Sequence, residues 1–144
     1  MKKTLALAVV ASLAVAGLAG AAEPNPIAIR QAGQDLMLGT FTGIRGVLAA
    51  KGDISKLEEP AKAMAKWIRV FPTLFPPGSD KGETKALPAI WSDRAGFEKA
   101  AEHFADTADK LAVLIKAGDA SAVAAQVKVV GEACGACHKT YRAR

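Results

Sequence analysis

The sequence has 144 residues, of which 51% are hydrophobic and 23% charged, and a formal net charge of +5. A chain of this length can bury the core of one small domain without metal or disulfide cross-links. Its lysines and arginines are intermixed with acidic residues and form no basic run with interleaved aromatics, which excludes the usual pattern of a nucleic-acid-binding protein.

The beginning of the sequence has the three-part pattern of a secretory signal peptide. Two lysines precede an apolar run from Leu5 to about Leu18, and an A-x-A cleavage signal ends at Ala21. The run is too short for a membrane-spanning helix. We therefore expect residues 1–21 to be cleaved and residues 22–144 to form one mildly basic domain in the periplasm or an equivalent exported space. No second apolar stretch is long enough to cross a bilayer, so we expect no membrane insertion after cleavage.

The first predicted helix runs from about Ile27 to Lys51 and ends at Gly52-Asp53. Residues that alternate at spacings of three and four form its inward seam, which is the period expected of one helix face. Two polar residues, Arg30 and Gln34, interrupt this seam. The seam consists of Ile27, Arg30, Gln34, Met37, Phe41, Ile44 and Leu48.

The second predicted helix begins with Ser55-x-x-Glu58, a capping-box pattern in which each side chain satisfies a free backbone N–H of the other residue. Pro72 ends this helix, because proline cannot continue an α-helix. Residues 72–91 then contain four of the seven prolines and predict a long irregular connection. Connections of this length in compact domains are usually functional or cross between non-adjacent helices.

The third predicted helix begins near Ser92-Asp93 and ends at Gly118, and Asp119 can cap the fourth helix. The third carries an apolar stripe of Phe97, Ala101, Phe104, Ala108, Leu111 and Ile115. The stripe of the fourth contains Val123, Val127, Val130, Cys134, Cys137 and Tyr141. Four amphipathic helices without strand patterns predict an all-α, antiparallel four-helix bundle.

Both cysteines lie in the sequence Cys134-Gly135-Ala136-Cys137-His138. The pattern C-x-x-C-H is the attachment signal of c-type haem. Two thiols three residues apart on a helix project from nearly the same face, so they can bind the two vinyl groups of one porphyrin. The imidazole of His138 can then bind the iron. The motif predicts one covalent haem c per chain.

A structural disulfide, a thioredoxin-like dithiol and a zinc site are the alternatives for this cysteine pair. Redox dithiols normally open a helix after a strand, where the helix dipole lowers the thiol pKa, whereas this motif lies near the end of a helix. Zinc would need two further ligands, and the only other histidine is His103. We therefore prefer haem attachment, with a disulfide or a dithiol as the alternative.

Motifs along the whole predicted domain resemble the class II c-type cytochromes, which include cytochrome c′ and the low-spin cytochromes of the c-556 type. The C-terminal motif is specific and the others support it. The matching segments are Arg30-Gln31-Ala32, Phe75-Pro76-Pro77-Gly78-Ser79, Ile90-Trp91-Ser92-Asp93 and Cys134-x-x-Cys137-His138-x-x-Tyr141-Arg142. The resemblance implies a four-helix bundle with the haem attached near the C-terminus.

The resemblance also implies a function and a set of site residues. It implies a periplasmic haem protein, often a homodimer, that exchanges electrons with redox partner proteins or binds NO or CO. We expect a carrier rather than an enzyme. Cys134 and Cys137 would be the thioether attachments and His138 the proximal iron ligand. The residues expected at the haem edge are Arg30, Gln31, Ser79, Asp80 and Arg142.

The sixth iron ligand separates the two functions, and the sequence departs from the common pattern of the family at this point. Members usually carry leucine or methionine four residues after the arginine that matches Arg30, whereas this chain has Gln34. The Gln34 amide is a weak iron ligand but could donate a hydrogen bond to a bound diatomic. Met37, one turn further along the seam, is the other candidate for the sixth ligand, unless it only fills the core.

Overall fold

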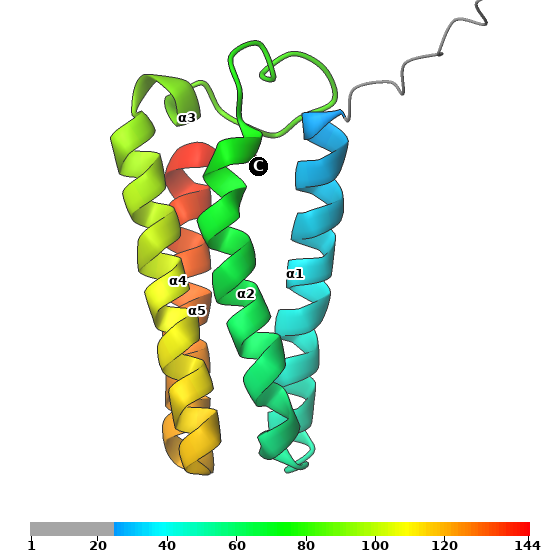
Figure 1. Cartoon of the computed structure of the whole chain (residues 1–144), viewed down its shortest axis with the longest axis vertical. Helices are drawn as coiled ribbons and strands as arrows, with labels where there is room; N and C mark the ends of the chain where they lie inside the picture. Colours follow the sequence, from blue (N-terminus) through cyan, green and yellow to red (C-terminus); the bar gives the residue numbers. More distant parts are fainter. Residues whose placement is uncertain (1–24) are drawn as a thin grey trace, which may run out of the picture.

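The computed structural model describes residues 25–144, and the predicted signal peptide lies outside the described residues. Four long helices pack side by side, each antiparallel to the one before it (Figure 1). Within the described residues no helix is long and apolar enough to cross a membrane. The long helices are α1 (Pro26–Ala49), α2 (Glu58–Val70), α4 (Arg94–Ala117) and α5 (Ala120–Tyr141). The predicted all-α four-helix bundle is confirmed.

Short helical turns occur in two of the connections. The 3-10 turn η1 (Ile54–Leu57) precedes α2, and η2 (Phe71–Leu74) follows it directly. The four-residue helix α3 (Ala89–Ser92) precedes α4. Between η2 and α3 the chain forms the long loop at the upper end of the bundle, where α1 begins and α5 ends (Figure 1).

Caps fix both ends of α4 and the start of α5 where the sequence predicts them. The Asp119 carboxylate accepts a hydrogen bond from Ala122 N (2.9 Å) at the start of α5, and Gly118 ends α4 with a left-handed φ of 77°. The predicted capping box at Ser55 is wrong. Asp53 instead accepts from both the backbone N–H (3.0 Å) and the hydroxyl (2.6 Å) of Ser55, and Glu58 pairs with Lys62. The Asp53 carboxylate thus starts a 3-10 turn over residues 54–57. As a result, α2 begins at Glu58, three residues after Ser55, where the pattern predicts its start.

The core is formed mainly by α2, α4 and α5, because α4 makes extensive contacts with both of its neighbours. Every residue of the predicted α4 stripe is buried, from Phe97 to Ile115. On α1, by contrast, only Arg30 and Ile44 are buried. Met37, Phe41 and Leu48 are partly buried against the core. The seam of α1 therefore faces inward but is separated from α5 over much of its length.

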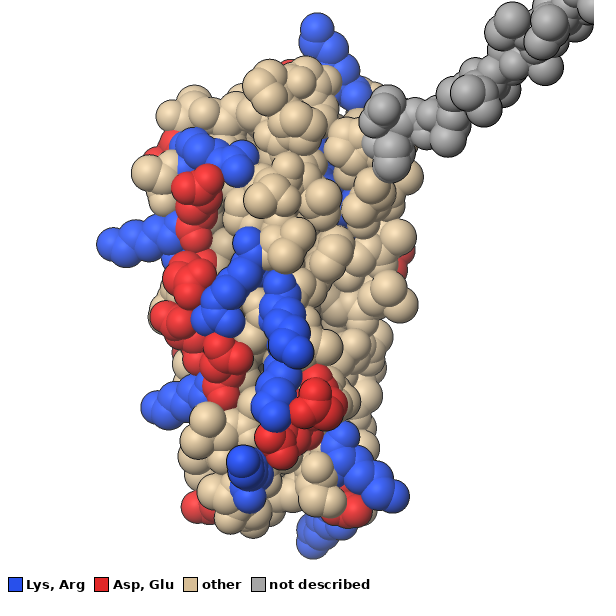
Figure 2. Space-filling model, viewed as in Figure 1, with Lys and Arg blue, Asp and Glu red and all other residues tan. Residues whose placement is uncertain are grey.

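An exposed ion-pair network links α2 to α4 on the outside of the bundle. The guanidinium of Arg69 lies 3.1 Å from Glu102, 3.2 Å from Asp106 and 2.8 Å from Asp109. Figure 2 shows the acidic groups of this side gathered beside basic ones along the bundle. Exposed pairs of this kind stabilise a fold only modestly, so the network reinforces the packing of α2 on α4 rather than determining it.

Candidate functional site

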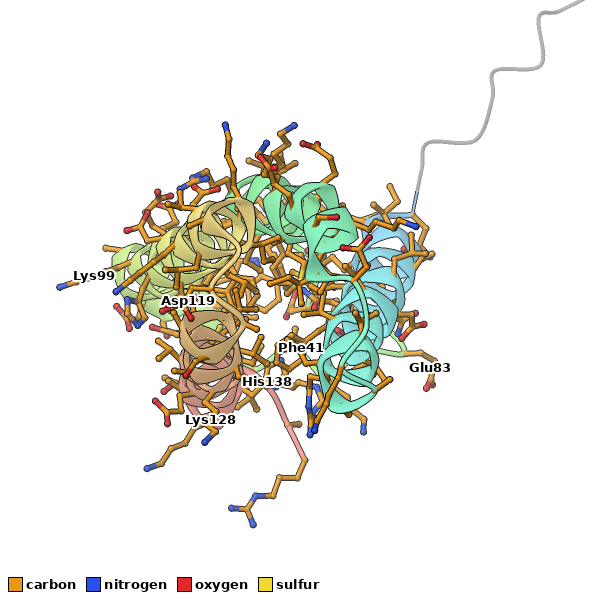
Figure 3. All side chains as sticks on the ribbon, turned by 90° about the horizontal axis from the view of Figure 1, so that it is seen from below. Phe41, Glu83, Lys99, Asp119, Lys128 and His138 are labelled. Carbon is orange, nitrogen blue, oxygen red and sulfur yellow. The ribbon has the colours of Figure 1, made fainter. Side chains whose placement is uncertain are left out.

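An open cavity of about 730 Å³ lies between α1 and α5, with α2 and α4 behind it. Its volume is within the usual range for sites that bind a small molecule or cofactor. Figure 3 shows Phe41 of α1 and His138 of α5 on the two sides of the space between these helices. From α1, the lining includes Arg30, Gln31, Gln34, Met37 and Phe41; from the C-terminal part, it includes Cys134, Cys137, His138, Tyr141 and Arg142.

The two cysteines line this cavity from one face of α5. Both are half-buried; Cys134 packs against the main core and Cys137 against a smaller cluster that contains Phe75 and Phe97. Burial, with a smaller contribution from Cys137, raises the pKa of Cys134 to about 11, and burial also raises the pKa of Cys137. A redox dithiol requires a thiol with a lowered pKa, so this environment disfavours the dithiol alternative.

His138 follows Cys137 and lines the same cavity. Burial and the nearby charge of Arg142 lower the pKa of His138 from its ordinary value. This shift favours the neutral imidazole, which is the form that binds a metal ion. Within residues 25–144 the structure brings together no group of three or more His, Cys, Asp or Glu side chains that could hold a metal ion, so the zinc alternative finds no ligand set there.

Arg30 is the most buried charged residue at the site, with 4% of its surface exposed. Its Nη1 donates to Leu74 O (3.0 Å) and Ser79 Oγ (2.8 Å), and its Nη2 donates to Ser79 O (2.8 Å). The guanidinium also lies over the ring of Phe75, 4.3 Å from its centre. Although Arg30 borders the cavity, these contacts show that it ties the start of α1 to the long loop.

The other residues expected at the haem edge fall into two groups. Gln31 and Arg142 line the cavity, and the Gln31 amide also donates to Glu83 O (2.7 Å). Ser79 and Asp80 are not among the lining residues: Ser79 is buried against Arg30, and Asp80 is exposed. The loop instead contributes residues 84–86, which no sequence motif marks.

Gln34 and Met37 both line the cavity from α1, as does Leu38 at its exposed side. Both candidate distal residues are partly buried, and Met37 also contacts the core. The seam of α1 therefore brings both side chains to the wall that faces α5.

The end of α5 is attached to the loop and to the start of α4. Tyr141 O accepts from Leu87 N (3.0 Å), Ala143 N donates to Lys85 O (2.8 Å), and Ala86 forms an isolated antiparallel bridge with Arg142. The hydroxyl of Tyr141 donates to Asp93 Oδ2 (2.8 Å), and this bond raises the pKa of Tyr141 to about 12. The turn that carries His138 is thus fixed at its C-terminal side.

A family model described as cytochrome c′ matches residues 25–142. The chain belongs to the cytochrome c′ family. It is 36% identical over 121 residues to cytochrome c′ of Rubrivivax gelatinosus, covering 82% of this chain and 94% of the relative. It is also 38% identical over 112 residues to a cytochrome c-556 of Agrobacterium tumefaciens (strain II Chrys), covering 74% and 90%. The predicted resemblance is confirmed.

Solved structures of cytochrome c′ share the fold. The crystal structure of the R. gelatinosus protein aligns with a TM-score of 0.73 at 35% identity and covers 82% of this chain and 94% of that one. A cytochrome c′ with ligand-controlled dimer dissociation aligns with a TM-score of 0.78 at 30% identity and covers 86% and 100%. A nitric oxide complex of a cytochrome c′ variant from Alcaligenes xylosoxidans aligns at 0.74 and 29% identity, covering 83% and 94%.

The residues of the cavity fit the covalent haem that membership of the cytochrome c′ family implies. Two thiols and an imidazole occupy one wall, and aromatic and aliphatic side chains form much of the remainder. Phe71, Phe97 and Phe104 are among them, so the cavity offers flat apolar surfaces to a macrocycle. Charged groups, including Lys85 and Arg142, are also present in the lining and suit a ligand with polar substituents.

We expect Arg30→Lys to destabilise the protein by roughly 1–3 kcal/mol, because an ammonium group cannot reproduce the forked hydrogen bonds to Leu74 and Ser79. Thermal unfolding of the two proteins measures this difference. Arg45→Lys is the matched control, since Arg45 is an exposed arginine on the same helix and its replacement should change stability by no more than about 0.5 kcal/mol. Equal losses in both variants would contradict the anchoring role of Arg30.

Proposed function

We propose that this member of the cytochrome c′ family is an exported c-type cytochrome that carries one covalent haem c and transfers single electrons. The observation that carries the proposal is the position of Cys134, Cys137 and His138 on one wall of the same cavity. The two thiols would form the thioether bonds and the His138 imidazole would bind the iron. Bound haem would supply an iron that changes between the ferric and ferrous states.

The surrounding residues would hold the group and limit its access to water. Phe41, Phe71 and Phe104 would pack against its faces, and Gln31 and Arg142 would lie at its polar edge. Arg30 borders the cavity, whereas Ser79 and Asp80 lie further away. These three residues would influence the polar edge of the haem by holding the loop in place.

The exposed cationic groups near the cavity would favour a redox partner with an acidic surface. Export to the periplasm and assembly as a homodimer are parts of the same proposal.

Binding of a small gas is the second candidate function. It is supported by a cytochrome c′ from A. xylosoxidans, variants of which have been solved as a nitric oxide complex and with carbon monoxide bound. In this chain Gln34 lines the cavity, and its amide N–H could donate a hydrogen bond to a diatomic ligand. Met37 would favour electron transfer instead, because a thioether that binds haem iron together with an imidazole raises the reduction potential.

Optical spectra of the holoprotein in both oxidation states test which candidate is correct. Electron transfer with Met37 as ligand predicts sharp α and β bands when reduced and a sulfur-to-iron band when oxidised, and Met37→Leu should remove the sulfur band. Gas binding predicts a broad high-spin spectrum that shifts on addition of carbon monoxide. Leu36→Ala is the control on the same helix, because Leu36 is 74% exposed and does not line the cavity. A sulfur band that survives in Met37→Leu would contradict the assignment of Met37.

A further inference from the structure

We propose that Tyr141 and Asp93 form a side-chain latch that sets the orientation of His138. The inference rests on the proposed function, because it takes His138 as the iron ligand. It assigns to Tyr141 the role of a positioning residue that acts through His138, not that of a group that touches the iron.

The acceptor of the latch is held in place by the fold. Asp93 is the N-cap of α4, and its Oδ1 accepts from the backbone N–H of Gly96 (3.2 Å). Its Oδ2 accepts from the hydroxyl of Tyr141 (2.8 Å). One carboxylate therefore both starts α4 and binds the last residue of α5. Since each oxygen has its own donor, the capping bond fixes the direction in which Asp93 meets Tyr141.

The donor is equally constrained. Tyr141 is 7% exposed, and its ring meets that of Phe97 in an edge-on contact with centroids 5.2 Å apart. Its carbonyl accepts from Leu87 N (3.0 Å), so the loop holds its backbone as well. Ring packing, the hydroxyl bond and the backbone bond together restrain rotation of Tyr141 about the axis of α5.

His138 is coupled directly to this fixed end. It lies three residues before Tyr141, close to one helical turn, and its carbonyl accepts from Arg142 N (3.1 Å). A rotation of the last turn of α5 would therefore move both Tyr141 and His138. The groups around a histidine ligand normally fix the orientation of its ring. This orientation determines how the ring nitrogen approaches the metal. Here the latch fixes the backbone turn from which the imidazole projects.

Gly96 provides the space that the latch needs. A Cβ atom at this position would lie 2.2 Å from Asp93 Oδ2 and 2.6 Å from the Tyr141 hydroxyl. Glycine disfavours the helical conformation relative to alanine, so its presence in the first turn of α4 calls for a reason. The close approach of these two oxygen atoms supplies that reason.

The test compares Tyr141→Phe with a variant that loses a buried hydroxyl elsewhere. Tyr141→Phe removes the latch bond but keeps the ring. Thr107→Val is the matched control, because Thr107 is buried on α4, donates its hydroxyl to Phe104 O (2.7 Å) and does not line the cavity. The readouts on the holoproteins are the midpoint reduction potential, the electron paramagnetic resonance spectrum of the ferric form and the melting temperature.

We expect Tyr141→Phe to shift the midpoint potential and to broaden or displace the ferric resonance, because the imidazole is then less firmly oriented. Thr107→Val should lower the melting temperature while leaving potential and resonance at the wild-type values. Asp93→Asn, whose single amide oxygen can still accept one of the two hydrogen bonds, should lie between wild type and Asp93→Ala, which accepts neither. If Tyr141→Phe lowers only the melting temperature, the positioning role is wrong. A wild-type protein without covalent haem would overturn the proposed function itself.

Discussion

Replacement of Cys134 and Cys137 together by alanine is expected to abolish covalent haem attachment. Both thiols lie on the α5 face that borders the cavity. Because the chain contains no other cysteine, no other side chain could form the thioether bonds. The exported double variant should have the mass of the mature polypeptide alone. Haem staining of a denaturing gel and intact-mass measurement both detect the difference.

The matched control is Ala136→Ser, an exposed substitution between the two cysteines that keeps both thiols and the histidine. It should load haem like the wild type. The single variant Cys134→Ala should lose normal loading, because one of two attachment points is gone. A Cys134→Ala protein that carries a full complement of covalent haem would refute the assignment of the motif.

The second large effect is expected at Gly33, where α1 passes Trp67 of α2. A Cβ atom at Gly33 would lie 1.9 Å from Cζ2 and 2.3 Å from Cη2 of Trp67, so Gly33→Ala forces the indole or the helix to move. Displacing a packed aromatic ring costs roughly 1–3 kcal/mol. Because α1 forms one wall of the cavity, this displacement should also change the visible spectrum of the holoprotein. Thermal unfolding and absorption spectra measure the two effects.

Gly39→Ala is a control on the same helix, because a Cβ atom there meets nothing within 4 Å. Alanine favours the helical conformation, so this variant should be stabilised by about 0.4–1 kcal/mol. The double variant Gly33→Ala with Trp67→Phe should recover part of the loss, since the smaller ring leaves room for the methyl group. Equal stability changes at Gly33 and Gly39 would show that the contact with Trp67 is unimportant.

The helices and the cysteine motif could be predicted from the sequence because their signals are local. The stripe from Phe97 to Ile115 repeats with the helical period, and tertiary packing buries every member of it. The C-x-x-C-H motif is confined to five residues and is specific. The failure at Ser55 has a local cause as well: Asp53, two residues earlier, accepts the hydrogen bonds that start the turn.

The connections at the upper end could not be predicted in the same way, because they join residues far apart in the chain. Arg30 meets Ser79, 49 residues away, and Tyr141 meets Asp93, 48 residues away. Neither pair leaves a periodic pattern. The interrupted seam of α1 indicated only that Arg30 and Gln34 face inward. The structure adds that Arg30 holds the loop. It also shows that Gln34 and Met37 both border the cavity.

The intact mass of the protein purified from the periplasm of a bacterium that matures c-type cytochromes tests the central claim most directly. We predict the mass of the polypeptide that begins at Ala22 plus the mass of one haem, unchanged after denaturation. A mass equal to that of the polypeptide alone, from a host that loads haem onto other c-type cytochromes, would contradict the assignment of Cys134, Cys137 and His138 as the haem site.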